Sequence, residues 1–201
     1  MKIKLIPFLL LLLFACESKE LVETQASTKT YANSIQQQFE LDLQHYMDSY
    51  NAQHWDEVYL TTYSGVFGRK TKDEVTTDFI QQNLFGIKRT INLRKIEKIS
   101  PVVEDDKNKY AKIYYDALVQ INLEGEALKN KDFIKNNVEL SHDTPDVIFD
   151  ESNNALLLDA YCSMIAVSKK GSNIWKYIEV DKQKEPYYNQ IIPEAILAQL
   201  D

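Results

Sequence analysis

Residues 110–123 alternate without interruption between apolar and more polar side chains. A period of two places successive side chains on opposite faces of a β-strand. A strand with one uniformly apolar face is typical of an antiparallel sheet that packs that face on the core. The apolar positions are Ala111, Ile113, Tyr115, Ala117, Val119, Ile121 and Leu123. Because an isolated strand or hairpin is at best marginally stable in water, this segment predicts a sheet of several strands.

Three further segments predict strands of the same sheet. Residues 155–167 alternate in the same way, and residues 87–99 form a strand with one irregularity. A hairpin turn at 169–172 leads into a last strand at 174–180.

Two C-terminal regions are harder to assign. Residues 125–150 are the least regular, and we expect a short helix near 126–135 followed by a strand near Val138. Residues 193–200 predict a terminal helical turn.

Helices precede the sheet. Apolar residues recur at spacings of three and four from Ser34 to Tyr50, which predicts an amphipathic helix with Ser34 as its N-cap. Trp55, Val58 and Tyr59 predict a short second helix. A third helix is expected to begin at Thr71-Lys72-Asp73-Glu74, which has the form of a capping box, and to end at Gly86.

The first fifteen residues have the composition of a targeting segment. Lys2 and Lys4 precede an almost unbroken apolar run from residue 6 to residue 15, with five consecutive leucines. The run is shorter than the roughly 20 residues of a transmembrane helix, and it suits the apolar region of a signal peptide. It ends in Leu13-Phe14-Ala15-Cys16, which resembles the lipobox of bacterial lipoproteins.

This resemblance implies that residues 1–15 are removed and that Cys16 carries the lipid that anchors the protein to a membrane. Residues 16–33 are polar and are predicted to form a flexible tether. Glu17 is not the aspartate that retains many lipoproteins at an inner membrane, which favours the outer membrane of the cell envelope. Ser18-Lys19-Glu20 is similar to surface-export signals of Bacteroidetes lipoproteins. The alternative is an ordinary secretory signal with a chance cysteine.

The charge of the chain limits its partners. The formal net charge is −7, and it becomes −9 if Lys2 and Lys4 are removed with the signal peptide. An acidic surface argues against nucleic acid, whose phosphates would repel it. It also argues against adsorption to anionic lipid, so the lipid on Cys16 is predicted to provide membrane binding.

Three passages resemble the NTF2-like (SnoaL-like) superfamily. Residues 46–58, with Trp55-Asp56 at the turn, are similar to its first two helices, residues 71–84 to its third, and residues 164–178 to its last hairpin. The resemblance implies an α+β cone over residues 34–201, in which three N-terminal helices pack on a curved, mostly antiparallel sheet. A cystatin-like or lipocalin-like fold is the rival, although three helices before the sheet disfavour a lipocalin.

Enzymes of this superfamily use Asp, His and Tyr inside the cone, but no family catalytic motif maps onto this chain. His45 and His54 are nine residues apart, which is about 180° of rotation on one helix. His142 is expected in a loop, and no spacing resembles a zinc site. Cys162 lies in an apolar strand and is predicted to be a buried, inert thiol. We therefore predict no catalytic residues, no metal and no cofactor.

Two groups of side chains remain as candidates for binding. Three tyrosines on apolar faces are predicted to line a cavity for a small apolar or aromatic ligand: Tyr46, Tyr50 and Tyr115. The alternative is that they are ordinary core tyrosines. Three polar residues share the other face of the 155–167 strand and are expected to point mainly outward: Asp159, Tyr161 and Ser163.

Three functions remain open. The first is a noncatalytic envelope module that binds a small ligand or a partner protein. The second is a dehydratase-type or isomerase-type enzyme that uses a polar cluster inside the cone. The third is a structural module that forms a homodimer through the outer face of the sheet, where Tyr110, Tyr114 and Leu118 are mildly apolar.

Overall fold

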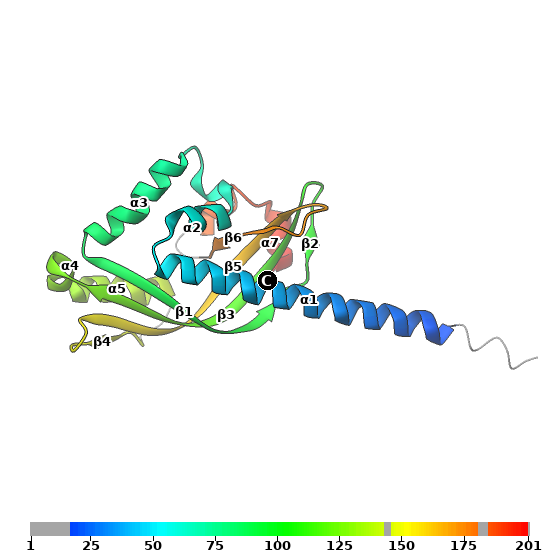
Figure 1. The fold of residues 1–201 in the computed structure, drawn as a ribbon, viewed down its shortest axis with the longest axis horizontal. Coiled ribbons are helices and arrows are strands. Elements are labelled where there is room, and N and C mark those ends of the chain that lie inside the picture. Colours follow the sequence, from blue (N-terminus) through cyan, green and yellow to red (C-terminus); the bar gives the residue numbers. More distant parts are fainter. Residues whose placement is uncertain (1–16, 143–145, 181–184, 201) are drawn as a thin grey trace, which may run out of the picture. The chain divides into compact units, whose positions relative to one another are not determined.

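The computed structural model describes residues 17–142, 146–180 and 185–200. The predicted signal peptide and Cys16 lie outside these residues. The fold is α+β, and its antiparallel sheet curls into a half-barrel (Figure 1). The predicted α+β class and the curved antiparallel sheet are therefore confirmed.

The sheet is built around two long central strands, β3 (Asn108–Leu123) and β5 (Ala155–Lys169). Strand β1 (Ile87–Ile99) pairs with β3, and β2 (Val103–Glu104) continues this pairing along β3. Strands β4 (Ile148–Asp150) and β6 (Trp175–Glu179) both pair with β5, at residues 155–157 and 164–168 respectively. All pairings are antiparallel.

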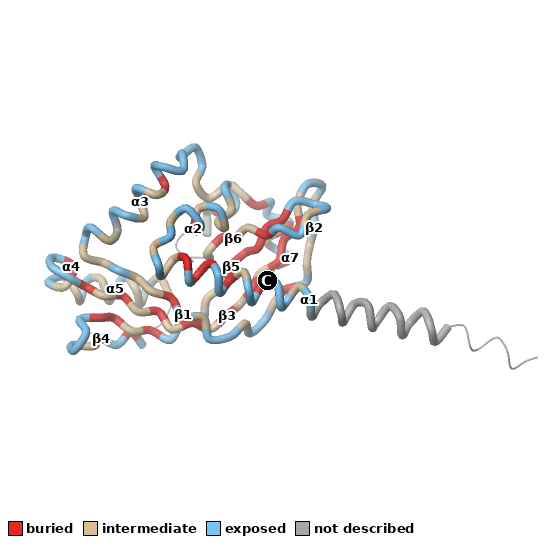
Figure 2. The backbone as a smooth tube through the Cα atoms, in the orientation of Figure 1, coloured by how far each residue is buried: buried red, intermediate tan, exposed pale blue. Residues whose placement is uncertain are grey.

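One face of the sheet is buried along the whole of β3, as the alternation predicts. Every apolar position from Ala111 to Leu123 is at most 7% exposed, whereas the intervening side chains from Lys112 to Asn122 are intermediate (Figure 2). Directly opposite residues on neighbouring strands lie on the same face. We call this face the buried face, and the opposite one the outer face.

The curl of the sheet has a local cause in β1. Its register against β3 shifts twice, between Leu93 and Lys95 and between Ile96 and Lys98. Such β-bulges bend a strand and increase its twist. They account for the irregularity that the sequence shows at 87–99.

The C-terminal part of helix α1 (Glu17–Asn51) lies on the sheet. The Asn51 side chain accepts a hydrogen bond from the Ile91 backbone N–H and donates one to the Ile91 carbonyl oxygen, both at 2.8 Å. The Tyr177 hydroxyl donates to the Asp42 carboxylate at 2.5 Å. Leu43, Tyr46 and Met47 are buried, as the helical spacing predicts.

Helix α1 begins at Glu17, although the sequence predicts a flexible tether up to residue 33 and an N-cap at Ser34. Residues 17–33 have helical backbone, and Ser34 lies inside the helix. Much of this segment is Glu, Lys, Gln and Ala, which have high helix propensity, so a helix formed at 34–51 extends through them at little cost. Among the described residues, those up to Leu41 and those from Asp42 onward form two compact units.

Helix α2 (Trp55–Thr61) and the 3-10 helix η1 (Ser64–Phe67) lead to α3 (Lys72–Leu84). The capping box is present, because the Thr71 hydroxyl accepts from the Glu74 backbone N–H and the Glu74 carboxylate accepts from the Thr71 N–H. Gly86 follows α3 with a φ of 75°. A Cβ atom there would lie 2.3 Å from the Glu124 carbonyl oxygen, so the turn requires glycine.

Two helices fill the segment that the sequence left least clear, α4 (Gly125–Lys129) and α5 (Lys131–His142). The prediction of a strand near Val138 is wrong, because this residue lies in α5. The prediction that His142 lies in a loop is also wrong, because His142 is the last residue of α5. Ile134 and Val138 are four residues apart, which places them on one side of a helix, and α5 packs against β5.

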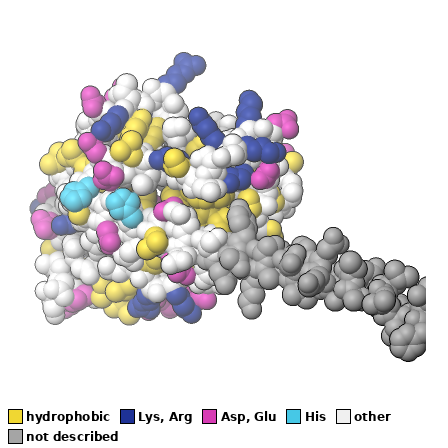
Figure 3. Space-filling view, turned by 45° about the vertical axis from the view of Figure 1, so that its right-hand side comes forward, with side chains coloured by type: hydrophobic (Ala, Val, Ile, Leu, Met, Phe, Trp, Pro, Cys, Tyr) yellow, Lys and Arg dark blue, Asp and Glu magenta, His cyan; other side chains and the backbone are white. Residues whose placement is uncertain are grey.

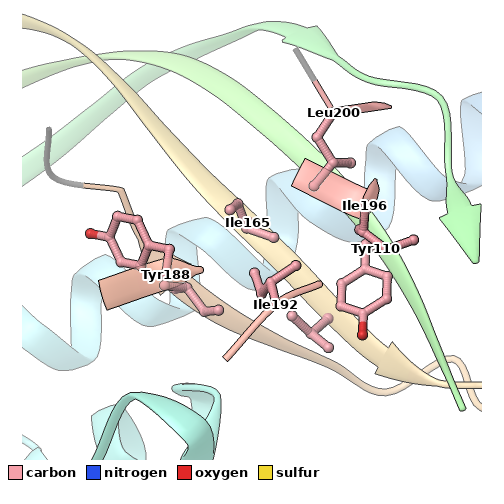
Figure 4. Close-up of a cluster of buried hydrophobic side chains, with 8 residues drawn as sticks. Tyr110, Ile165, Tyr188, Ile192, Ile196 and Leu200 are labelled. Atoms are coloured by element: carbon pink, nitrogen blue, oxygen red, sulfur yellow. The ribbon is translucent and has the colours of Figure 1, made fainter. Parts of the chain in front are cut away.

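The C-terminal helices α6 (Glu185–Tyr188) and α7 (Glu194–Leu200) cover part of the outer face. Tyr188, Ile192, Ile196 and Leu200 form one buried cluster with side chains of the sheet (Figure 4). Tyr110 belongs to this cluster and is 2% exposed, so its own chain covers the side chain that the sequence assigned to the wet face. Elsewhere on the surface, acidic and basic side chains are interspersed, as Figure 3 shows for one face.

We expect Ile113→Asp to lower the free energy of unfolding by at least about 4 kcal/mol, because it places an unpaired charge at a fully buried position. Lys88→Asp, at an exposed position of β1, is the control and should change the stability by less than about 0.5 kcal/mol. Chemical denaturation monitored by circular dichroism measures both. Similar losses in the two variants would contradict the assignment of the faces.

Candidate functional site

An ion pair lies on the buried face of the sheet. In the strand register, Arg89 is opposite Ile121 and Glu179 is opposite Met164, so both side chains point to this face. The Arg89 guanidinium donates to Glu179 Oε1 at 2.8 Å. Their side chains are only 23% and 32% exposed. Removing charges from water is costly, and the pairing offsets that cost.

Three tyrosines interact electrostatically with the Arg89–Glu179 pair: Tyr46, Tyr50 and Tyr115, which we call the tyrosine cluster. The first two come from α1, and their rings are stacked with centroids 6.5 Å apart. Burial raises the pKa of all three phenols, and the negative charge of Glu179 raises them further. The hydroxyls therefore stay protonated and can form hydrogen bonds without adding charge.

Cys162 adjoins this group from β5, where it is opposite Tyr115 in the register. Burial and the charge of Glu179 raise the pKa of its thiol to about 11. The thiolate is the reactive form of cysteine, so this side chain is a protonated, weakly reactive group at neutral pH. The Tyr115 hydroxyl lies beside it and has no partner with hydrogen-bond geometry among the described residues.

A cavity of about 620 Å³ adjoins the Arg89–Glu179 pair and reaches both faces of the sheet. Tyr161, Cys162 and Ser163 all line it, and consecutive side chains of a strand point to opposite faces. The cavity therefore extends around an edge of β5. Among the described residues, no strand pairs with residues 158–162 on this side, since β4 and β6 occupy the stretches before and after them.

The two ends of the cavity differ in chemistry. On the buried face it is lined by Arg89, Ile121, Cys162 and Glu179. On the outer face it is lined by Lys112, Tyr114, Tyr161, Ser163 and Ile165. There Tyr114 and Tyr161 stack with ring centroids 6.0 Å apart, and the Lys112 ammonium lies 5.1 Å from the Tyr114 ring centroid.

Helices complete the wall of the cavity. Helix α5 contributes Val138, Ser141 and His142, and the C-terminal region contributes mainly Tyr188, Leu197 and Leu200. No residue of α5 is fully buried. This part of the wall therefore provides both apolar side chains and polar ones, the latter being Ser141, His142 and Asn189.

The predicted site residues lie next to the cavity rather than in its wall. None of the tyrosine cluster lines it, but all three interact electrostatically with Arg89 and Glu179, which do. Their role in ligand binding stays a prediction. Tyr161 and Ser163 line the outer end, whereas Asp159 is exposed and pairs with Arg94 at 2.7 Å. His45 and His54 are exposed and lie outside the cavity wall.

Arg89 and Glu179 are not among the site residues predicted from the sequence. The signal is a charged residue at an apolar position of an alternating strand, since Arg89 shares its face with Ile87 and Ile91. A charge is seldom buried without a partner, so this pattern indicates a second charge of opposite sign. The partner is 90 residues away in the chain, and only the strand register brings the two together.

Among the described residues, no group of three or more His, Cys, Asp or Glu side chains could hold a metal ion. No helix in these parts of the chain is long and apolar enough to cross a membrane. No known protein-family model matches the chain, and no curated protein matches its sequence. Function is therefore inferred from the geometry and chemistry of the cavity.

We expect Tyr115→Phe to leave the free energy of unfolding unchanged or to raise it by up to about 1 kcal/mol, because it removes a buried hydroxyl without a partner. Tyr177→Phe is the matched variant. It removes a hydroxyl that donates to Asp42, and we expect the free energy of unfolding to fall by about 2 kcal/mol. Urea denaturation of both variants measures the difference. A larger loss for Tyr115→Phe would show that its hydroxyl has a stabilising partner.

Proposed function

We propose that this chain is a lipid-anchored protein of the cell envelope, and that its globular part binds a small apolar or aromatic ligand without transforming it. The cavity is the observation that carries the proposal. Its volume of about 620 Å³ falls within the range of roughly 300–1,000 Å³ that is typical of small-molecule sites. Its wall combines apolar and aromatic side chains with polar groups from the strands, from α5 and from the C-terminal region, and polar groups that fix the orientation of a ligand are a feature of such sites.

The thiol and the phenols at the buried-face end of the cavity favour binding over catalysis. An acid or base catalyst works best when its pKa lies near the working pH. Burial instead raises the pKa of the Cys162 thiol to about 11 and raises the pKa of all three phenols of the tyrosine cluster. These groups are suited to hydrogen bonding and to polarity, but not to proton transfer at neutral pH.

The membrane anchor is proposed from the sequence. Cys16 directly precedes the first residue of α1, so the lipid would be joined to a helix rather than to an extended chain. At 1.5 Å per residue, helical residues 17–33 span about 26 Å. Such a helix would act as a spacer between the lipid and the rest of the protein at the outer membrane.

We further propose that the globular part is an NTF2-like cone. The order of the elements supports this, because helices α1, α2 and α3 precede a curled antiparallel sheet. The capping box of α3 and the β5–β6 hairpin lie in the passages that resemble the superfamily. Ligands bound inside such a cone would contact the buried face of the sheet, where the Arg89–Glu179 pair lies.

An enzyme of the dehydratase or isomerase type is the second candidate, because Glu179 and His142 line one cavity and Tyr115 adjoins it. A carboxylate beside a tyrosine could serve as a base. The ion pair with Arg89 argues against this role, because it holds the Glu179 carboxylate against the guanidinium. Turnover of a small hydroxy or keto compound that disappears in Glu179→Gln would favour the enzyme over the binding protein.

We expect the full chain to bind Nile red, a neutral dye that fluoresces in apolar surroundings, with a stoichiometry of about one. Ser163→Trp places an indole in the cavity and should weaken binding at least tenfold. Lys169→Trp is the control, because it adds the same side chain to the same face of β5 at an exposed position outside the cavity wall. Fluorescence titration measures all three proteins.

Equal loss of binding in the two tryptophan variants would place the dye elsewhere. If no saturable binding occurs in the unchanged protein, the proposed ligand-binding function is wrong.

We expect the chain expressed in a bacterial host to carry acyl groups on Cys16 and to sediment with membranes. Cys16→Ala removes the acceptor thiol, so the variant should lack the lipid and be released from the membrane. Mass spectrometry of the N-terminal peptide and membrane fractionation measure both effects. An unacylated Cys16 in the unchanged protein would rule out the anchor.

A further inference from the structure

The end of the cavity on the buried face is balanced in charge. Arg89 and Glu179 are its two charged side chains among the described residues, and they bind each other at 2.8 Å. Cys162, which also lines this end, and the tyrosine cluster beside the ion pair are protonated and neutral. A ligand that brings a further charge here would leave one charge without a partner in a desolvated place, which is strongly unfavourable.

Arg89 nevertheless has further hydrogen-bond donors that can bind a ligand. A guanidinium carries five N–H groups. Glu179 accepts from one nitrogen, and Tyr50 provides a further hydrogen bond. Because Arg89 lines the cavity, its remaining N–H groups can reach an oxygen of a bound molecule while the ion pair stays intact.

The rest of the wall requires an apolar body. Ile121 lies on the same face as Arg89, and Val138, Leu197 and Leu200 lie further along the wall. Burying an apolar group against these side chains stabilises the complex by about 25 cal/mol for each Å² removed from water. A polar group placed against these apolar side chains would lose its hydrogen bonds to water.

We infer that the cavity takes an uncharged ligand with an apolar body and one oxygen acceptor, such as a ketone or an ester, and that Arg89 binds this oxygen. Glu179 then has a second role besides holding Arg89, because its negative charge excludes the corresponding carboxylates. This inference rests on the proposed ligand binding and adds the chemical class of the ligand and its orientation.

A ligand could also bind in a second orientation, with its polar group at the outer end of the cavity. Lys112 lies there, on the opposite face of the sheet from Glu179. A carboxylate that bound to Lys112 would not approach Glu179, and its affinity would not depend on that residue. The effect of Glu179 on the choice between a ketone and a carboxylate therefore distinguishes the two orientations.

The experiment uses three compounds of nearly equal size: acetylnaphthalene, naphthoate and ethylnaphthalene, all substituted at the same ring position. Titrations of the full chain, followed by NMR or calorimetry, give the three dissociation constants. We expect the ketone to bind at least tenfold more tightly than the carboxylate, and about fivefold more tightly than ethylnaphthalene, which lacks the acceptor.

Glu179→Gln is the decisive variant. Glutamine keeps an acceptor for Arg89 but removes the negative charge, so the preference for the ketone over the carboxylate should shrink by at least tenfold or reverse. Glu104→Gln is the control, because it removes one negative charge from an exposed residue that pairs with Lys170 outside the cavity wall. It should leave the preference unchanged. Thermal melting confirms that both variants are folded.

Three outcomes overturn the inference. The first is that naphthoate binds as tightly as acetylnaphthalene in the unchanged protein. The second is that the preference for the ketone survives undiminished in Glu179→Gln, and the third is that acetylnaphthalene binds no more tightly than ethylnaphthalene. In each of these cases, binding of ethylnaphthalene would still support the proposed ligand-binding function. If none of the three compounds binds, the proposed function fails together with the inference.

Discussion

Burial of one face of β3 is the constraint on which the rest of the structure depends. The strand pairs with β1 and β2 on one side and with β5 on the other, so both of its edges are used. Its apolar face, from Ala111 to Leu123, is almost completely removed from water. A slip of one residue in either pairing would move all of these side chains to the outer face. The register of the neighbouring strands follows from this requirement.

The same register creates the polar site. With β1 held against β3, Arg89 must point to the buried face, and with β6 held against β5, Glu179 must do so as well. Neither charge would be tolerated there alone. Their pairing joins β1 and β6 across the sheet, and all three members of the tyrosine cluster interact electrostatically with the pair. The ion pair is therefore a polar group in a defined geometry on the largely apolar buried face.

The cavity results from incomplete pairing of β5. Strands β4 and β6 pair with its two ends, and side chains from both faces of the intervening stretch line the cavity. Helix α5 packs against this strand without burying any of its residues fully. A rigid sheet on one side and a lightly packed helix on the other are suited to admitting a ligand. Rigid strands hold the polar groups in place, and a helix with little burial moves at small cost.

Local patterns in the sequence determined much of the fold. The alternation at 110–123, the capping box at Thr71 and the end of the third helix before Gly86 are patterns of neighbouring residues, and each has the predicted structure. The apolar faces of Tyr46, Tyr50 and Tyr115 likewise predicted buried or half-buried tyrosines, but the structure places none of them in the cavity wall, and their role in ligand binding stays a prediction. The assignment failed near Val138, where a short amphipathic segment suits a strand or a helix equally well until its neighbours are known. Only the tertiary structure decided that Arg89 meets Glu179, that Tyr115 lies beside Cys162, and that β5 has an open stretch. These features join residues far apart in the chain, and their positions follow from strand register, which no local pattern contains.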